Sequence, residues 1–122
     1  MRRILVRNGI ESYPRFLEMA VGAALAETPM VVIQGARHMG KSALAKFVTA
    51  DSAGVRRVTL EDPAAIALAE SDPAFFVEQT GGGLLVIDES QRSPGLIPPL
   101  KASVARDQRS GRFLLHNHPL GI

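Results

Sequence analysis

Short apolar runs recur along this chain and alternate with segments of helical spacing. Residues 30–34 and 83–89 are almost continuously apolar, and residues 55–60 and 112–116 are two further candidate strands. Runs of this length are typical of parallel strands that are buried on both faces. Because the intervening segments predict helices, the pattern indicates an α/β layer with a parallel sheet.

The first predicted helix lies ahead of the run 30–34. Apolar residues recur at helical spacing after Pro14, and Pro29 ends the pattern before the strand. Together with the short apolar stretch 4–6, this pattern leads us to assign residues 1–28 to a helical lead-in.

Aspartate and proline mark the later helices. Asp62 and Asp72 each stand before a proline, so each places a capping acid ahead of a residue suited to the first helical turn. These pairs predict short helices at 63–70 and 73–79. Further helices are predicted at 41–50 and 100–106.

The composition is typical of a single globular domain. The chain has 122 residues, of which 46% are hydrophobic and 21% charged, and no apolar run approaches the roughly 18 residues of a membrane helix. It has no cysteine, which excludes disulfides and thiolate metal sites. With no signal-peptide pattern at its start, we expect a cytoplasmic protein without a membrane partner. The net charge of +2 comes mainly from scattered arginines and leaves nucleic-acid binding open.

The segment behind the run 30–34 has the spacing of a Walker A loop. It reads Gly-Ala-Arg-His-Met-Gly-Lys-Ser between a predicted strand and a predicted helix. In that context backbone N–H groups turn toward phosphate oxygens, and the helix N-terminus adds its positive dipole end. We expect Lys41 to supply a point charge, Ser42 to offer a hydroxyl to a phosphate-bound Mg²⁺, and the His38 side chain to face solvent. The predicted nucleotide-binding residues are Gly35, Ala36, Arg37, His38, Met39, Gly40, Lys41, Ser42 and Ala43.

Two acids end the run 83–89. Ligands of parallel sheets collect at the carboxyl ends of strands, so we expect Asp88 to meet the loop at Gly35 and to hold Mg²⁺. Glu89 has the chemistry to accept a proton from an attacking water, although neighbouring side chains on a strand point to opposite faces. The alternative is a pair of solvated acids at an exposed strand end. Catalysis by Glu89 also requires a completed site around its carboxylate.

Other polar residues favour structural interpretations. His116, Asn117 and His118 suggest a metal site, but two histidines without a further His or Cys partner are more typical of a strand that ends at the surface. We expect the later arginines on solvated helix and loop faces, with one of them a candidate to reach a neighbouring subunit's phosphate. These arginines are Arg92, Arg106, Arg109 and Arg112.

Four stretches together resemble a known family. They are the segment from Tyr-Pro-Arg at 13–15 through the loop, Val-Thr-Leu-Glu-Asp-Pro at 58–63, Leu-Val-Ile-Asp-Glu-Ser-Gln-Arg-Ser-Pro at 85–94, and Gly-Arg-Phe-Leu-Leu at 111–115. This set, above all Asp-Glu-x-Gln-Arg-x-Pro, is similar to the AAA-type P-loop ATPases of bacteria and archaea that carry an uncharacterised C-terminal domain. The resemblance covers nearly the whole chain.

The resemblance implies a fold and a set of roles. The implied fold is the P-loop NTPase three-layer sandwich with a parallel sheet. The implied cofactors are ATP and Mg²⁺, with Lys41 on the β- and γ-phosphates, Ser42 and Asp88 on the ion, and Glu89 as the water-activating base.

The chain departs from this family near its end. The family continues after the Phe-Leu-Leu strand with Thr-Gly-Ser, which supplies a polar sensor for the γ-phosphate, whereas this chain has His116, Asn117, His118 and Pro119 and stops at Ile122. We do not assign Asn117 as a replacement sensor. We expect the last core strand, the lid, the arginine-finger region and the C-terminal domain to be missing, so residues 1–122 form one truncated domain. A missing edge strand would expose apolar surface and predicts poor solubility.

Two classes of function follow from these residues. The first is ATP binding with weak or partner-dependent, Mg²⁺-dependent hydrolysis, in which a second copy or a full-length homologue supplies the arginine finger. The alternative is an inactive nucleotide-binding or protein-interaction remnant of a longer ATPase. The absence of Asn-Lys-x-Asp argues against a GTPase, and Glu89 with the missing acceptor lid argues against a small-molecule kinase. The sequence does not define the work coupled to ATP.

Overall fold

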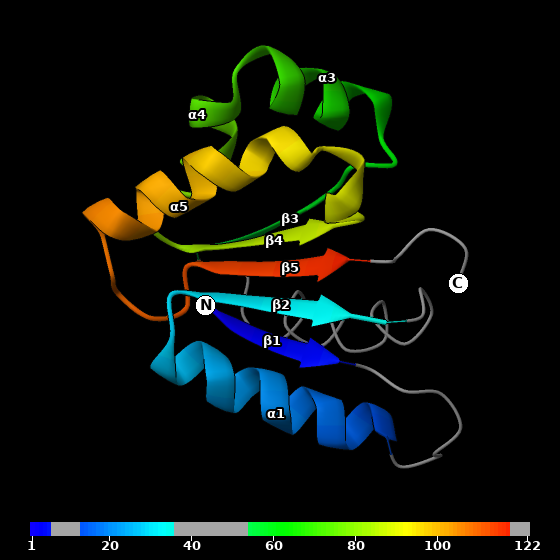
Figure 1. Cartoon of the computed structure of the whole chain (residues 1–122), viewed down its shortest axis with the longest axis vertical. Helices are drawn as coiled ribbons and strands as arrows, with labels where there is room; N and C mark the ends of the chain where they lie inside the picture. Colours follow the sequence, from blue (N-terminus) through cyan, green and yellow to red (C-terminus); the bar gives the residue numbers. More distant parts are fainter. Residues whose placement is uncertain (6–12, 36–53, 118–122) are drawn as a thin grey trace.

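A computed structural model describes the protein at residues 1–5, 13–35 and 54–117. These residues include a five-stranded sheet in which every strand runs parallel to its neighbours. Its carboxyl ends all lie along one edge, where the arrowheads point in Figure 1. The strands are β1 (Arg2–Leu5), β2 (Met30–Gln34), β3 (Val55–Thr59), β4 (Leu84–Asp88) and β5 (Phe113–Asn117), in the spatial order β1-β2-β5-β4-β3.

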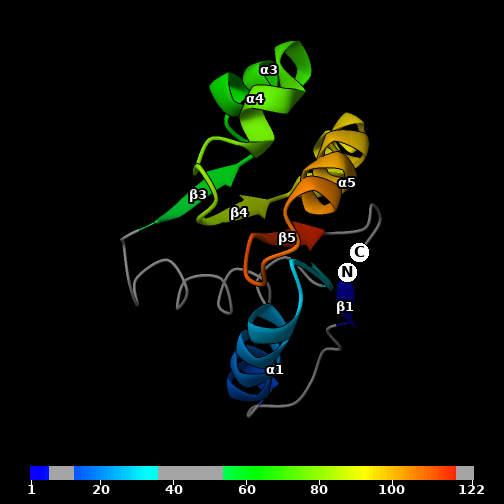
Figure 2. The same cartoon turned by 90° about the vertical axis from the view of Figure 1, so that its left-hand side faces the viewer.

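Helices cover both faces of the sheet, as Figures 1 and 2 show from two directions. One face carries α1 (Tyr13–Glu27), and the other carries α3 (Pro63–Ser71), α4 (Pro73–Val77) and α5 (Ile97–Arg106). Two short 3₁₀ turns, η1 (Ser90–Arg92) and η2 (Pro94–Leu96), connect β4 to α5. No helix in the described ranges is long and apolar enough to cross a membrane.

Each face of the sheet has its own buried core. Successive side chains on a strand point to opposite faces, so Val86 packs toward α1 while Ile87 packs toward α3, α4 and α5. Both faces of β2, β4 and β5 are therefore apolar, which explains why these strands read as continuous apolar runs. The core beside α1 contains Leu17, Val21, Ala24, Leu25, Val31, Ile33, Val86 and Leu114.

The predicted strands from β2 to β5 and the two capped helices are confirmed. The Asp62 carboxylate accepts a hydrogen bond from the backbone N–H of Ala64 at 3.0 Å. The Asp72 carboxylate accepts one from the N–H of Phe75 at 3.1 Å. Each acid thus satisfies an N–H that the first turn of α3 or α4 leaves unpaired.

The helical lead-in expected over residues 1–28 is wrong for its first residues. Arg2–Leu5 form β1, which pairs with β2 from Arg2 opposite Val31 to Leu5 opposite Gln34. A short apolar stretch does not by itself separate strand from helix, and the open ladder of β2 supplies hydrogen-bond partners that favour a strand. The side of β2 away from β5 is therefore paired with β1.

The predicted solvated position is also wrong for Arg112. Its side chain is 4% exposed, and its guanidinium donates to the Ser103 carbonyl at 2.8 Å, the Asp107 carbonyl at 2.9 Å and the Ser103 hydroxyl at 2.7 Å. The guanidinium carbon also lies 4.9 Å from the centre of the Phe113 ring. Arg112 donates to the carbonyl of the cap residue Asp107 and is a second donor to the Ser103 carbonyl, which also accepts the Asp107 N–H at 3.0 Å. It thereby joins the C-terminal end of α5 to the start of β5. The side chains of the other three arginines are exposed, as expected.

Candidate functional site

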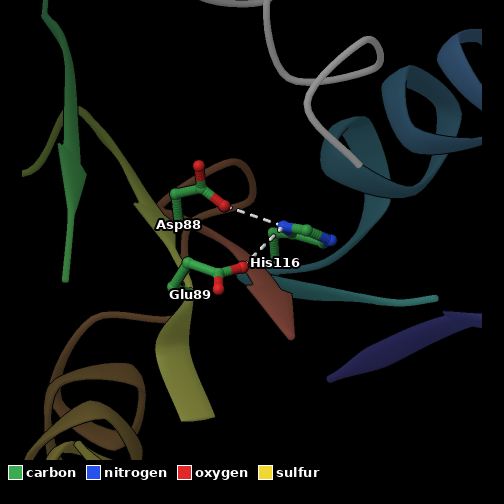
Figure 3. A group of neighbouring side chains, drawn as sticks. All are labelled: Asp88, Glu89 and His116. Atoms are coloured by element: carbon green, nitrogen blue, oxygen red, sulfur yellow. Dashed lines mark hydrogen bonds and ion pairs between the residues drawn. The ribbon is translucent and has the colours of Figure 1, made fainter. Parts of the chain in front are cut away.

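Three buried polar side chains meet at the carboxyl edge of the sheet. Asp88 ends β4, Glu89 follows it, and His116 lies near the end of the neighbouring strand β5 (Figure 3). Their exposed fractions are 0%, 2% and 0%. His116 Nδ1 lies 2.7 Å from Asp88 Oδ1 and 3.9 Å from Glu89 Oε2. We call Asp88, Glu89 and His116 the carboxylate–histidine cluster.

The backbone at Glu89 explains how two successive acids reach the same histidine. In a continuous strand their side chains would point to opposite faces of the sheet. Glu89 instead has φ 58° and ψ 44°, the left-handed conformation, and it is the only residue other than glycine with positive φ in the described part of the chain. This turn at the end of β4 brings both carboxylates toward His116. The left-handed conformation costs a residue with a Cβ about 1–2 kcal/mol, and such strained residues cluster at functional sites.

Asp88 is held in its charged form. Burial by itself would raise the pKa of Asp88, but the hydrogen bonds and charges of His116 and Arg57 together outweigh burial, so the pKa is lowered. The guanidinium of Arg57 on β3 lies 3.2 Å from Asp88 Oδ2. Both oxygens of Asp88 therefore have partners, one on each neighbouring strand.

Two atoms of the cluster have no hydrogen-bond partner in the part of the chain that the structure describes. They are Glu89 Oε2 and His116 Nε2, and both are fully buried. The other Glu89 oxygen accepts a hydrogen bond from the Gln91 side chain at 3.3 Å. A buried polar atom without a partner costs roughly 1–3 kcal/mol, so each such atom in a folded protein calls for an explanation. An incoming ligand is one explanation at this edge of the sheet.

The cluster lies close to the strand that leads into the Walker A sequence. Gly35 follows β2, and its N–H donates to the carbonyl of Asn117 at the end of β5 at 3.3 Å. Since β5 lies between β2 and β4, a single strand separates Gly35 from Asp88. The sheet thus brings the start of the loop and the acid pair to the same edge.

The remaining loop residues lie outside the described ranges, so their predicted roles stay predictions. The same holds for the predicted helix 41–50 and for His118. The loop residues are Ala36, Arg37, His38, Met39, Gly40, Lys41, Ser42 and Ala43.

The interpretation of His116 as part of a surface strand end is wrong. His116 is fully buried, because β5 is a central strand and the side chains two residues apart on it, Leu114 and His116, share one face. Asn117 points the other way and lines, with Gln34 and Ser90, a cavity of about 210 Å³. The alternative of two solvated acids is wrong as well, since Asp88 and Glu89 are both buried. Two features could have predicted that His116 is buried beside Asp88. They are the period-two pattern of β5 and the position of Asp88 at the end of a neighbouring strand.

A divalent cation fits this donor set. Asp88 is charged, Glu89 Oε2 has no hydrogen-bond partner among the described residues, and one ligand atom from each residue of the cluster lies within 4.8 Å of the others. Carboxylate oxygens are the side-chain ligands that Mg²⁺ takes in proteins, with waters and phosphate oxygens completing its shell. The implied Mg²⁺ is therefore compatible with the residues present.

The fold and the site together define a class of protein. A parallel α/β sheet with a buried acid pair at its carboxyl edge is compatible with a P-loop NTPase-like fold. Residues 27–117 match a family described as AAA domain, and the chain belongs to that family.

Two mycobacterial proteins are similar to this chain. An uncharacterized protein of Mycobacterium tuberculosis and one of Mycobacterium bovis are each 36% identical to it over 92 residues. The match covers 75% of this chain but 20% of each relative, so the chain spans about a fifth of the length of the curated relatives it matches. No solved structure matches the chain significantly. Both relatives are described as uncharacterized and assign no activity to the chain.

Proposed function

We propose that this chain binds ATP with Mg²⁺ and hydrolyses it slowly alone and faster with a partner. The observation that supports this most directly is the buried acid pair Asp88 and Glu89, one strand away from Gly35 at the carboxyl edge of the sheet. Ligands of open parallel sheets bind outside that edge. Membership of the AAA domain family supports a nucleotide as the ligand.

The proposed roles follow from the chemistry of each side chain. Asp88, charged and fixed from both sides, would hold Mg²⁺ together with Ser42, and Lys41 would neutralise phosphate charge. Bound Mg²⁺ supplies further charge neutralisation on the phosphates. Glu89 Oε2 is a buried acceptor without a donor among residues 1–5, 13–35 and 54–117, the condition in which a carboxylate accepts a proton from a positioned water.

The proposed dependence of hydrolysis on a partner rests on the positions of the arginines. Arg57 contacts Asp88, Arg112 is buried at the end of α5, and no other arginine of the described ranges forms an ion pair with the cluster. An arginine finger is worth about 10³–10⁵ in the rate of phosphoryl transfer. A second subunit or a further segment of a longer chain would supply it.

The alternative is a nucleotide-binding or interaction module without turnover. It is favoured by the pairing of Asp88, because His116 and Arg57 already occupy both of its oxygens. An ion would have to compete with these two partners. If the ion does not displace them, the domain keeps its fold and loses its catalytic cofactor.

The test compares binding with turnover. A ligand that binds only the folded state stabilises it, by about 2.7 kcal/mol at 100 times its dissociation constant. We expect Mg-ATP to raise the melting temperature of the parent chain and of Glu89→Gln but not of Lys41→Ala, and we expect ATP hydrolysis to be lost in Glu89→Gln. Glu70→Gln, which changes an exposed acid on α3, is the matched control.

Each negative result has its own meaning. A folded parent chain whose melting temperature does not respond to Mg-ATP contradicts nucleotide binding. Binding without hydrolysis in the parent, also after addition of a longer homologue, selects the inactive alternative.

A further inference from the structure

We propose that the carboxylate–histidine cluster binds a first-row transition metal ion such as Mn²⁺ in preference to Mg²⁺, with His116 as a nitrogen ligand. The inference rests on the proposed function for the role of the site and names its metal. It changes one assignment, because Glu89 Oε2 would bind the ion and the other Glu89 oxygen would then accept the proton. The binding itself requires no nucleotide, so it is testable separately.

The spacing of the three side chains suits a single ion. Ligand atoms bound at 2.0–2.2 Å from one ion lie about 3 to 4 Å from one another. His116 Nδ1 lies 2.7 Å from Asp88 Oδ1 and 3.9 Å from Glu89 Oε2. Small side-chain adjustments therefore place all three atoms around one cation. Figure 3 shows both carboxylates directed at the same ring nitrogen.

The charges around the cluster also favour a cation. In the described part of the chain, one guanidinium, that of Arg57, forms an ion pair with one of the two carboxylates, and it contacts Asp88 Oδ2 while His116 contacts Oδ1. Glu89 is 2% exposed, and no described residue forms a hydrogen bond with its Oε2. A buried carboxylate is costly unless it is paired or binds a metal. A divalent ion between Glu89 and Asp88 supplies the missing partner.

Metal binding requires a particular tautomer of His116. Without an ion, His116 Nδ1 is in hydrogen-bond contact with Asp88. For Nδ1 to bind a cation, the ring proton must reside on Nε2, because a neutral imidazole has one bare nitrogen. A charged carboxylate only accepts hydrogen bonds, so the contact with Asp88 places the proton on Nδ1, and an ion must replace this bond. The proton then moves to Nε2, which has no hydrogen-bond partner in the described part of the chain.

The nitrogen ligand determines which ion the cluster prefers. Mg²⁺ demands near-ideal octahedral geometry, loses its waters reluctantly and takes oxygen ligands. Imidazole suits later first-row metals, and carboxylates suit Mn²⁺ as well as Mg²⁺. Two carboxylates with one imidazole therefore bind Mn²⁺ and its neighbours more tightly than Mg²⁺.

The experiment titrates Mn²⁺ into the nucleotide-free chain and follows free Mn²⁺ by its electron paramagnetic resonance signal. We expect one bound ion per chain, retained when Mg²⁺ is present in tenfold excess. Loss of a ligand should weaken binding at least about tenfold, since loss of outer-shell partners alone costs 10–100-fold. His116→Asn and Glu89→Gln should show this loss, and Glu70→Gln should bind as the parent does. His116→Asn retains an amide that can donate to Asp88, and a thermal melt of each variant checks its folding.

Three results would overturn the proposal. These are no Mn²⁺ binding by the folded chain, equal affinity in the parent and His116→Asn, and displacement of Mn²⁺ by equimolar Mg²⁺. If His116→Asn does not fold, spin-echo spectroscopy of Mn²⁺ bound to the parent decides: coupling to an imidazole nitrogen supports the site, and its absence refutes it. Lys41→Ala separates the two proposals, because it should bind Mn²⁺ normally while losing its response to ATP.

Discussion

The left-handed backbone at Glu89 allows the structural cost of this residue to be separated from its chemistry. Glu89 has φ 58° and a buried oxygen that has no hydrogen-bond partner within the described ranges. Glu89→Ala removes the carboxylate but retains a Cβ in the left-handed conformation. Glu89→Gly removes both. Because glycine adopts positive φ without steric penalty, we expect the glycine variant to be more stable than the alanine variant.

The expected difference is about 1 kcal/mol. The left-handed conformation costs a residue with a Cβ roughly 1–2 kcal/mol, while the greater freedom of glycine in the unfolded chain offsets about 0.4–1 kcal/mol of that gain. Unfolding entropy is about 2.1 cal/mol/K per residue, so for 122 residues a change of 1 kcal/mol corresponds to a shift of about 4 °C in Tm.

The assay is reversible unfolding of both variants by heat and by urea, followed by far-ultraviolet circular dichroism. A chelator is included, because an ion bound by the remaining ligands would stabilise the folded state and hide the effect of the backbone. Equal m-values would show that the two variants expose the same surface on unfolding. A glycine variant that melts at or below the alanine variant would refute the reasoning that residue 89 is held under strain.

Three further predictions concern stability and titration. Arg112→Met should lower the free energy of unfolding by about 3 kcal/mol or more, because buried acceptors lose a charged donor. Urea unfolding measures this change. An effect no larger than that of Arg106→Met, which changes an exposed arginine, contradicts the prediction. Asp62→Ala should cost about 1 kcal/mol through its lost cap, and an unchanged urea midpoint would exclude that contribution. Hydrogen bonds from Arg109 lower the pKa of Asp107 from 3.8 to about 2, so this pair stabilises the fold above pH 3.8 and loses its effect as the pH falls toward 2. Arg109→Met should return the carboxyl titration, followed by NMR, toward 3.8, and an unmoved midpoint would show another cause.

The parts of the fold that were predicted correctly depend on short-range chemistry. Asp62 and Asp72 cap their helices through N–H groups two and three residues away, so the interaction is contained in the local sequence. The runs that became β2, β4 and β5 are apolar on both faces, and that pattern is visible without knowledge of the partner strands. The position of the acid pair was predicted from the same pattern, because the two acids end the apolar run that became β4.

By itself, the sequence determined the class of fold, the parallel sheet and the edge at which Asp88 and Glu89 would lie. Only the tertiary structure decided that Arg2–Leu5 joins the sheet, that Arg112 is buried and that His116 faces the two acids. Each of these depends on hydrogen-bond partners in another element of the fold, because buried polar groups require partners and the local sequence does not show which groups will meet. The left-handed turn at Glu89 belongs with them, because the surrounding structure must outweigh a local backbone preference to hold it.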